Sequence, residues 1–261
     1  MGSISISRLS RDTQQHCISR RSKYSFLFAV ILPFLAAPSL CHSQQDPGSF
    51  DVSLFRTIND GRSVFLGKLV DLNNDVVFPL GVLTPIGFLS YGILSSNVYE
   101  VDTGVLAAIS EVVSFGVEQG LKRVVKRERP YLALADVHVA EIESGGSYSF
   151  PSGHATGAFA LATALSLRYP KPSVYIPLHL WALFVAYGRV YLGVHYPSDV
   201  FVGGVIGSGT ALAVHLLEDR ILALKAKIFG GTGEEGSSLK GFALSFTPLR
   251  GGAVINLSYR L

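Results

Sequence analysis

Apolar residues fall in long runs that are separated by short polar stretches over most of this chain. Five runs are expected to form helices, at residues 76–99, 103–121, 155–169, 173–194 and 200–217. Several approach the ~20 residues that a helix needs to cross the hydrocarbon core of a bilayer, although the third is shorter. The pattern predicts an all-α bundle. We interpret it as membrane-embedded, and the alternative is the core of a soluble domain.

Two different segments precede these runs. A polar, basic stretch leads into an apolar run from Tyr24 to Leu40, which is the layout of a secretory signal or an uncleaved anchor. Residues 1–43 are therefore expected to be a signal peptide or N-terminal anchor. Residues 46–75 have an amphipathic pattern and are expected to form an entry helix that lies against the bundle.

The end of the chain has another character. Residues 230–238 are rich in Gly and Ser, as in a flexible linker. Two segments of alternating polarity then flank residues 248–252, and this arrangement predicts a β-hairpin. The expected domains are the N-terminal segment at 1–43, a helical domain at 44–228, and a linker with a terminal β-hairpin at 229–261.

Composition supports the membrane interpretation. Charged residues make up only 16% of the chain, against about 25% in soluble domains. The net charge of +3 is too small to indicate nucleic-acid binding. Cys17 and Cys41 are the two cysteines and both lie near the N-terminus, so the sequence predicts neither a zinc site nor a disulfide framework.

The first polar motif, at residues 122–130, contains Lys122 and Arg129 followed by Pro130. Seven residues are two helical turns, so the two cations are expected to share a helix face that Pro130 ends or bends. Two cations at this point could hold one phosphate, with Arg129 supplying a bidentate fork. Taken alone, the motif fits an ordinary basic collar at a membrane-helix end better than a phosphate site. Glu118 stands four residues before Lys122, which predicts an ion pair.

The second motif is Pro151-Ser152-Gly153-His154, directly ahead of an apolar run. Pro151 suits the first turn of a helix, and a helix N-terminus is a ready anion site. Gly153 leaves the backbone open to a ligand, and Ser152 can donate its hydroxyl. His154 would stand at the site edge and give a proton to a leaving oxygen. The alternative is a capped helix start with an incidental histidine.

The third motif, at residues 188–199, contains Arg189, His195 and Asp199. Asp199 follows His195 by four residues and can accept from one imidazole nitrogen, which leaves the other nitrogen for substrate. Pro197 indicates a loop that enters the next helix. Arg189 is expected at the end of the preceding helix. The alternative is an interfacial His–Asp pair without chemistry.

Together the three motifs resemble those of the type 2 phosphatidic acid phosphatase (PAP2) family, whose site vanadium haloperoxidases share. The family pattern is K-x6-RP, PSGH and SR-x5-H-x3-D, and here it covers about 80 residues. One position departs from it, because Gly188 replaces the usual serine before Arg189. We expect this to remove one hydroxyl near the phosphate without removing a catalytic group.

The resemblance implies a role for each residue. His195 would attack phosphorus and become a phosphohistidine, and Asp199 would orient it. His154 would protonate the leaving group and then activate water. The phosphate oxygens would be held by Lys122, Arg129, Arg189, Ser152 and Gly153. No metal and no cofactor are expected.

The charges of the loops predict where such a site would face. If the chain begins in the cytoplasm, alternation places the basic stretches at 168–171 and 220–227 on the cytoplasmic side, as the positive-inside tendency requires. All three motifs then lie on the outer side of the membrane. This count is consistent with one site built from three loops.

The leading hypothesis is a phosphatase in the cell (inner) membrane that hydrolyses lipid phosphate monoesters or diphosphates on its periplasmic or exterior side. Its partners would be the lipid substrate and the membrane lipids, with no nucleic acid. Candidate substrates are phosphatidate, phosphatidylglycerol phosphate, undecaprenyl diphosphate and a lipid A phosphate. The alternatives are a soluble periplasmic acid phosphatase, a vanadate-dependent haloperoxidase, and a lipid-binding or transport protein without turnover.

Overall fold

The computed structural model describes residues 48–139, 148–229, 241–249 and 252–260. The expected signal peptide or anchor at 1–43 and the linker at 230–238 lie outside these described residues. The chain divides into two compact units, one up to Leu216 and one from Leu217 onward.

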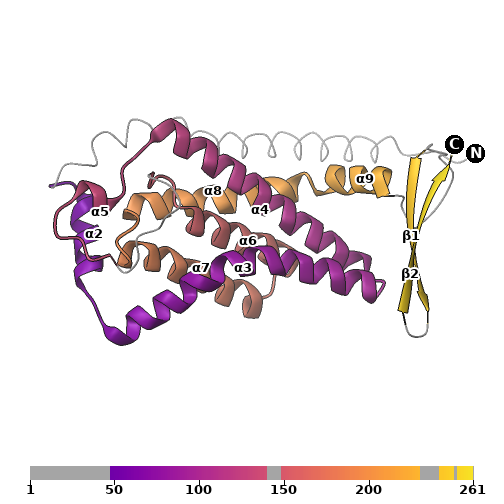
Figure 1. The fold of residues 1–261 in the computed structure, drawn as a ribbon, viewed down its shortest axis with the longest axis horizontal. Coiled ribbons are helices and arrows are strands. Elements are labelled where there is room, and N and C mark those ends of the chain that lie inside the picture. Colours follow the sequence, from indigo (N-terminus) through magenta and orange to yellow (C-terminus); the bar gives the residue numbers. More distant parts are fainter. Residues whose placement is uncertain (1–47, 140–147, 230–240, 250–251, 261) are drawn as a thin grey trace, which may run out of the picture. The chain divides into compact units, whose positions relative to one another are not determined.

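The first unit is a bundle of helices, as the sequence predicts (Figure 1). The central helix α6 packs mainly against α4, α7 and α8, and α3 packs against α4. The elements are α2 (Phe50–Asp60), α3 (Val64–Leu94), α4 (Val98–Val125), α5 (Pro130–Ala133), α6 (Gly153–Arg168), α7 (Pro172–Tyr191) and α8 (Pro197–Leu216).

Small residues allow α6 and α8 to cross closely. A Cβ atom on Gly207 would lie 2.1 Å from the carbonyl oxygen of Thr156, and one on Gly203 would lie 2.7 Å from that of Ser152. Since only glycine fits at these points, the two backbones are held in direct contact. The start of α6 is therefore held next to the start of α8.

The region before the bundle differs from the sequence-based expectation. The single entry helix predicted over residues 46–75 is wrong, because α2 ends at Asp60 and α3 already begins at Val64. The polar residues at positions 73 and 74 are paired with α7. Asn73 accepts a hydrogen bond of 3.0 Å from the indole nitrogen of Trp181, and Asn74 accepts one from Arg189. These polar contacts lie within α3. The helix begins at Val64, twelve residues before the apolar run that predicts it.

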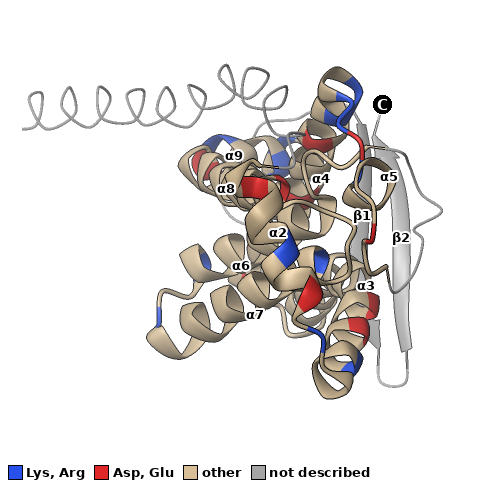
Figure 2. Ribbon diagram, turned by 90° about the vertical axis from the view of Figure 1, so that its left-hand side faces the viewer, with Lys and Arg blue, Asp and Glu red and all other residues tan. Residues whose placement is uncertain are grey.

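Two helices, α3 and α8, are long and apolar enough to cross a membrane. Only 17% of the most apolar window of α3 is buried inside the protein, so most of that window faces outward. Figure 2 shows that most of the helical ribbon carries neither acidic nor basic residues. Large apolar side chains are exposed on several helices, among them Phe78, Leu83, Ile86, Val112, Phe115, Leu180, Leu183 and Phe201. Such a surface is typical of contact with lipid.

The second unit contains the helix α9 (Glu218–Phe229) and two strands, β1 (Gly241–Leu249) and β2 (Gly252–Arg260). The strands pair in antiparallel register, from Gly241 opposite Arg260 to Leu249 opposite Gly252.

Candidate active site

The three polar motifs meet at one end of the bundle, where α4 and α7 end and α6 and α8 begin (Figure 1). Backbone hydrogen bonds join their loops in series. The amide of Ser149 donates to the carbonyl of Arg127 at 2.7 Å, and the amide of Ser152 donates to the carbonyl of Asp199 at 3.1 Å. The prediction that the three motifs share one end of the bundle is therefore confirmed.

Lys122 is held in place by several contacts. Its Nζ lies 3.1 Å from Oε1 of Glu118, which confirms the predicted ion pair. The same atom donates to the carbonyl of Tyr148 at 3.2 Å and to that of Pro151 at 2.9 Å. These bonds fix the ammonium group between the first and second motifs.

Arg129 does not share a helix face with Lys122, so that expectation is wrong. Helix α4 ends at Val125, and Lys126 follows in the left-handed conformation with φ 52°. Arg129 instead stands at the N-cap of α5, is 3% exposed, and donates from Nη1 to the carbonyl of Val194 at 3.5 Å. The turn, rather than helical spacing, brings its guanidinium to the third motif.

Helix α6 begins two residues later in the second motif than the position of Pro151 predicts. The helix begins at Gly153 with Ser152 as its N-cap, so Pro151 lies before the helix and not in its first turn. The Ser152 hydroxyl oxygen accepts from the amide of Ala155 at 3.5 Å, because a serine cap satisfies a free helix-end N–H. Its hydroxyl hydrogen remains able to donate. A Cβ on Gly153 would lie 3.0 Å from Oε1 of Glu118, so glycine lets this carboxylate approach.

His195 lies in the loop between α7 and α8 and is 2% exposed. Its Nδ1 is 3.5 Å from Oδ2 of Asp199, longer than a well-formed hydrogen bond. Such contacts are often loose without substrate and tighten when it binds. Oδ2 of Asp199 also accepts from the amide of Tyr196 at 2.8 Å, which fixes the carboxylate behind the imidazole.

The electrostatics of the site keep His195 neutral. Burial, followed by the positive charges of Arg189, Arg129 and Lys122, lowers the pKa of His195 well below its usual 6.5. A neutral imidazole retains the lone pair that a nucleophile needs. The same effect shows that cations from the first and third motifs act on this one ring.

His154 stands at the start of α6, ahead of the apolar segment of that helix. Burial, then the charges of Arg129 and Lys122, lowers its pKa to about 4. An anion bound between those cations would offset their charge and favour the protonated ring. His154 is thus able to gain a proton when a phosphate enters.

Arg127 is a functional candidate that the sequence reasoning missed. Its Nη1 donates to Oδ1 of Asp199 at 2.7 Å, and its Nη2 donates to Oδ2 of Asp51 at 2.7 Å. The guanidinium also lies over the ring of Tyr196, 3.8 Å from the centroid. In the sequence it is one of several basic residues between Lys122 and Arg129, so nothing distinguished it there.

Asn74 was missed as well. Arg189, on the last turn of α7, is 2% exposed and donates from Nη1 to Oδ1 of Asn74 on α3. This bond orients the third cation of the site. Only the position of α3 beside α7 reveals it, because 115 residues separate the two in sequence.

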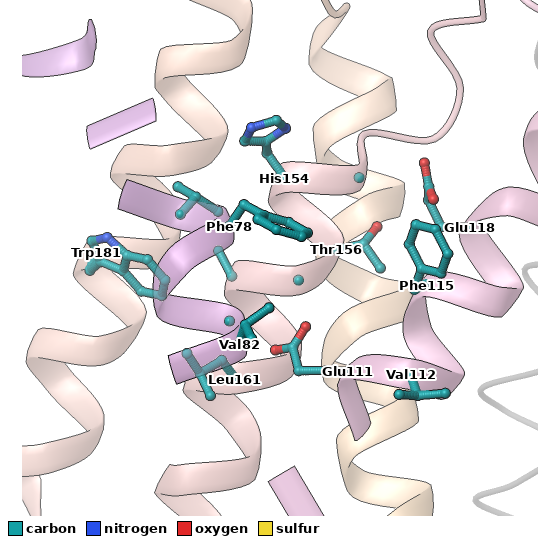
Figure 3. A pocket seen from close by; sticks show the side chains of 15 residues that line it. Phe78, Val82, Glu111, Val112, Phe115, Glu118, His154, Thr156, Leu161 and Trp181 are labelled. Atoms are coloured by element: carbon teal, nitrogen blue, oxygen red, sulfur yellow. The ribbon is translucent and has the colours of Figure 1, made fainter. Parts of the chain in front are cut away.

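An apolar cavity of about 450 Å³ extends from His154 between α3, α4, α6 and α7 (Figure 3). Gly153 and Glu118 also line it, so it is continuous with the site. Its apolar walls include Phe78, Val82, Phe115, Leu161 and Trp181. Buried cations and two histidines therefore lie beside an apolar cavity, an arrangement that suits an anion carrying a hydrocarbon group.

The sequence also matches those of known proteins. Residues 103–222 match the model of the PAP2 superfamily. The undecaprenyl-diphosphatase of Sulfolobus acidocaldarius is 31% identical over 196 residues, which are 72% of this chain and 88% of that protein. The lipid A 4'-phosphatase of Bacteroides thetaiotaomicron is 38% identical over 84 residues, 32% of this chain, and the chain spans only 37% of that relative.

A solved structure shows the same fold. The transmembrane PAP2 type phosphatidylglycerolphosphate phosphatase of Bacillus subtilis superposes with a TM-score of 0.60 and 25% identity, covering 75% of this chain and 96% of that one. The chain belongs to the PAP2 superfamily, and its relatives support a phosphatase of the PAP2 type. The two apolar helices and these membrane relatives indicate a membrane protein.

Proposed function

We propose that the protein hydrolyses lipid phosphate monoesters or diphosphates at the membrane–water boundary, through a phosphohistidine on His195 and without a metal ion. The observation that carries this proposal is the position of His195. It is buried among three cations, is backed by Asp199, and lies in the site from which the apolar cavity extends.

In the first step, Nε2 of His195 attacks phosphorus while Asp199 faces Nδ1. A P–N bond forms and the bond from phosphorus to the leaving oxygen breaks. His154 gives that oxygen a proton, so the leaving group departs as a neutral alcohol or a protonated phosphate. The positive charge that develops on the His195 ring is stabilised by the Asp199 carboxylate.

In the second step, the now neutral His154 accepts a proton from a water molecule, and the oxygen of that water attacks phosphorus. The P–N bond breaks, inorganic phosphate forms, and His195 recovers its lone pair. Charge on the phosphoryl oxygens rises in both steps, where fixed donors stabilise it most. We propose that these donors are the side chains of Lys122, Arg129 and Arg189, the Ser152 hydroxyl and the Gly153 N–H.

Two features favour a lipid as the substrate. The cavity that leaves the site is walled by apolar side chains from four helices, which suits a hydrocarbon chain. The relatives described above are named as phosphatases of undecaprenyl diphosphate, lipid A and phosphatidylglycerol phosphate. A soluble phosphomonoester would leave such a cavity without an occupant.

We place the protein in the inner membrane, with residues 44–228 as the phosphatase domain and the site on the periplasmic or exterior side. The distribution of basic residues supports this orientation. Arg168 lies at the opposite end of α6 from His154 and donates to the carbonyl of Tyr99 at the start of α4. Basic residues at that end favour a cytoplasmic location for it.

The test is phosphate release from lipid phosphates and soluble monoesters by detergent-solubilised protein in chelator, beside His195→Ala. Lipid turnover that vanishes in the variant, together with a phosphorylated protein trapped in His154→Ala, is the expected result. Activity that is lost in chelator and restored by magnesium would overturn the metal-free mechanism. Turnover of soluble esters alone would point to a periplasmic acid phosphatase, and lipid binding without turnover to a binding protein.

A further inference from the structure

One acidic side chain in the cavity takes no part in the mechanism above. Glu111 lies on α4 seven residues before Glu118, which is two helical turns or about 10 Å farther from the phosphate end. Figure 3 shows its carboxyl group among the apolar side chains of the cavity wall, below His154. Its Oε1 atom is buried and has no hydrogen-bond partner among the described residues.

The surrounding helices leave room for this carboxyl group. A Cβ on Gly157 of α6 would lie 3.3 Å from Oε2 of Glu111, and one on Gly81 of α3 would lie 3.8 Å from the same atom. Glycine at position 157 therefore lets the carboxyl group approach α6 closely, while Gly81 leaves ordinary contact distance on the α3 side. In contrast, Glu118 on the same helix already has Lys122 as its partner.

A buried polar group without a partner costs free energy, and the cost is larger when the group is ionised. Acidic residues at membrane depth are rare and usually functional. Glu111 lines a cavity that is continuous with the site of phosphate chemistry, and Oε1 of this lining side chain is the atom without a partner. A partner for it is most directly supplied by the molecule that occupies the cavity.

We propose that Glu111 recognises the linkage region of the lipid, so that the substrate is an acyl lipid phosphate with an ester or amide group between phosphate and hydrocarbon. A carboxylic acid donates to an ester or amide carbonyl, and a carboxylate accepts from an amide N–H. A polyprenyl chain offers neither group and would leave Glu111 unpartnered. This inference rests on the proposed function and narrows its substrate class.

The test compares a diacyl phosphatidate with its dialkyl ether analogue, which lacks only the carbonyls, and with a polyprenyl phosphate. We expect the wild-type protein to show a kcat/KM about tenfold higher for the diester than for the diether, the effect of about one hydrogen bond. Glu111→Leu should bring this ratio close to one, whereas Glu111→Gln, which still donates and accepts, should retain most of it. Val113→Leu changes an exposed position on the same helix outside the cavity lining and should keep the wild-type ratio.

Turnover of a soluble phosphomonoester reports that each variant is folded. Equal kcat/KM for diester and diether in the wild type, or equal losses on both in Glu111→Leu, would overturn the inference while leaving the lipid phosphatase intact. A clear preference for the polyprenyl phosphate would also overturn it. Failure of the wild type to hydrolyse any lipid, with the soluble ester turned over, would overturn the proposed function itself.

Discussion

Nη1 of Arg127 lies 2.7 Å from Oδ1 of Asp199, and both side chains are almost completely buried. The contact leaves Oδ2 of Asp199 directed toward His195. A buried carboxylate needs a compensating charge to remain ionised, and Arg127 supplies it. The arginine thus acts on the proposed nucleophile through Asp199, as a positioning residue.

Replacing Arg127 by Met should lower kcat by about 10- to 100-fold and change KM by less than twofold. The reason is that Arg127 contacts Asp199 and Asp51 rather than the proposed phosphate position. Loss of one partner from a buried pair also costs about 3–5 kcal/mol of stability. Steady-state kinetics at saturating lipid, with thermal unfolding in detergent, measure both effects.

Two further variants separate positioning from folding. Arg127→Lys keeps the charge and should recover part of kcat. Asp51→Asn weakens the ion pair between Asp51 and Arg127 but leaves the bond from Arg127 to Asp199. This variant should therefore lower stability with little loss of kcat. Equal kcat losses in Asp51→Asn and Arg127→Met would show that Arg127 is structural only.

Asn74→Leu should weaken inhibition by inorganic phosphate about tenfold, because Arg189 loses the acceptor that orients it. The neighbouring Asn73→Leu is the matched control. Asn73 bonds to Trp181 instead of Arg189, so phosphate inhibition should stay at the wild-type value. Similar phosphate affinity in both variants would mean that Arg189 is oriented by its other contacts.

Gly207→Ala should destabilise the bundle by about 1–3 kcal/mol or more, since its Cβ would lie 2.1 Å from the backbone oxygen of Thr156. Gly116 on α4 has no atom within 4 Å of the position of an added Cβ. Gly116→Ala should therefore be neutral or stabilising by up to about 1 kcal/mol, from helix propensity. Thermal unfolding of both variants checks the contrast, and equal losses would contradict the close crossing of α6 and α8.

Acid should destabilise the wild type partly through His154. The folded pKa of about 4 lies below the ordinary value of 6.5, so between these values the unfolded chain binds a proton that the folded protein does not. Stability is then fully present above about pH 6.5 and falls as the pH drops toward 4, by at most about 3 kcal/mol.

His154→Asn removes this titration and should reduce the loss of melting temperature between pH 7 and pH 4.5. The comparison is made in the same detergent, with His179→Asn as the control because that histidine lies outside the site. An unchanged acid sensitivity in His154→Asn would show that His154 is not held neutral in the folded protein.

How far the sequence predicts the site depends on the range of each interaction. The Glu118–Lys122 pair follows from helical spacing, and the meeting of the three motifs follows from alternating helices. The start of α6 and the end of α4 differ from the prediction, because a serine cap and a left-handed residue outweigh the prolines nearby.

Long-range contacts could not be predicted in this way. Asp51 and Arg127 are 76 residues apart, and Asn74 and Arg189 are 115 apart. No local pattern links such pairs, since the packing of whole helices brings them together. The apolar cavity arises in the same way, from four helices whose separate sequences show only hydrophobic runs.

The attachment of Asp51 to Arg127 also has an evolutionary consequence. The match to the PAP2 superfamily model begins at residue 103, so α2 and its Asp51 lie outside the matched residues. Asp51 is a second carboxylate that balances the arginine behind Asp199, so the buried guanidinium depends on both acidic groups. Among homologues, an arginine at the position of Arg127 and an acidic residue at the start of α2 should therefore be gained and lost together.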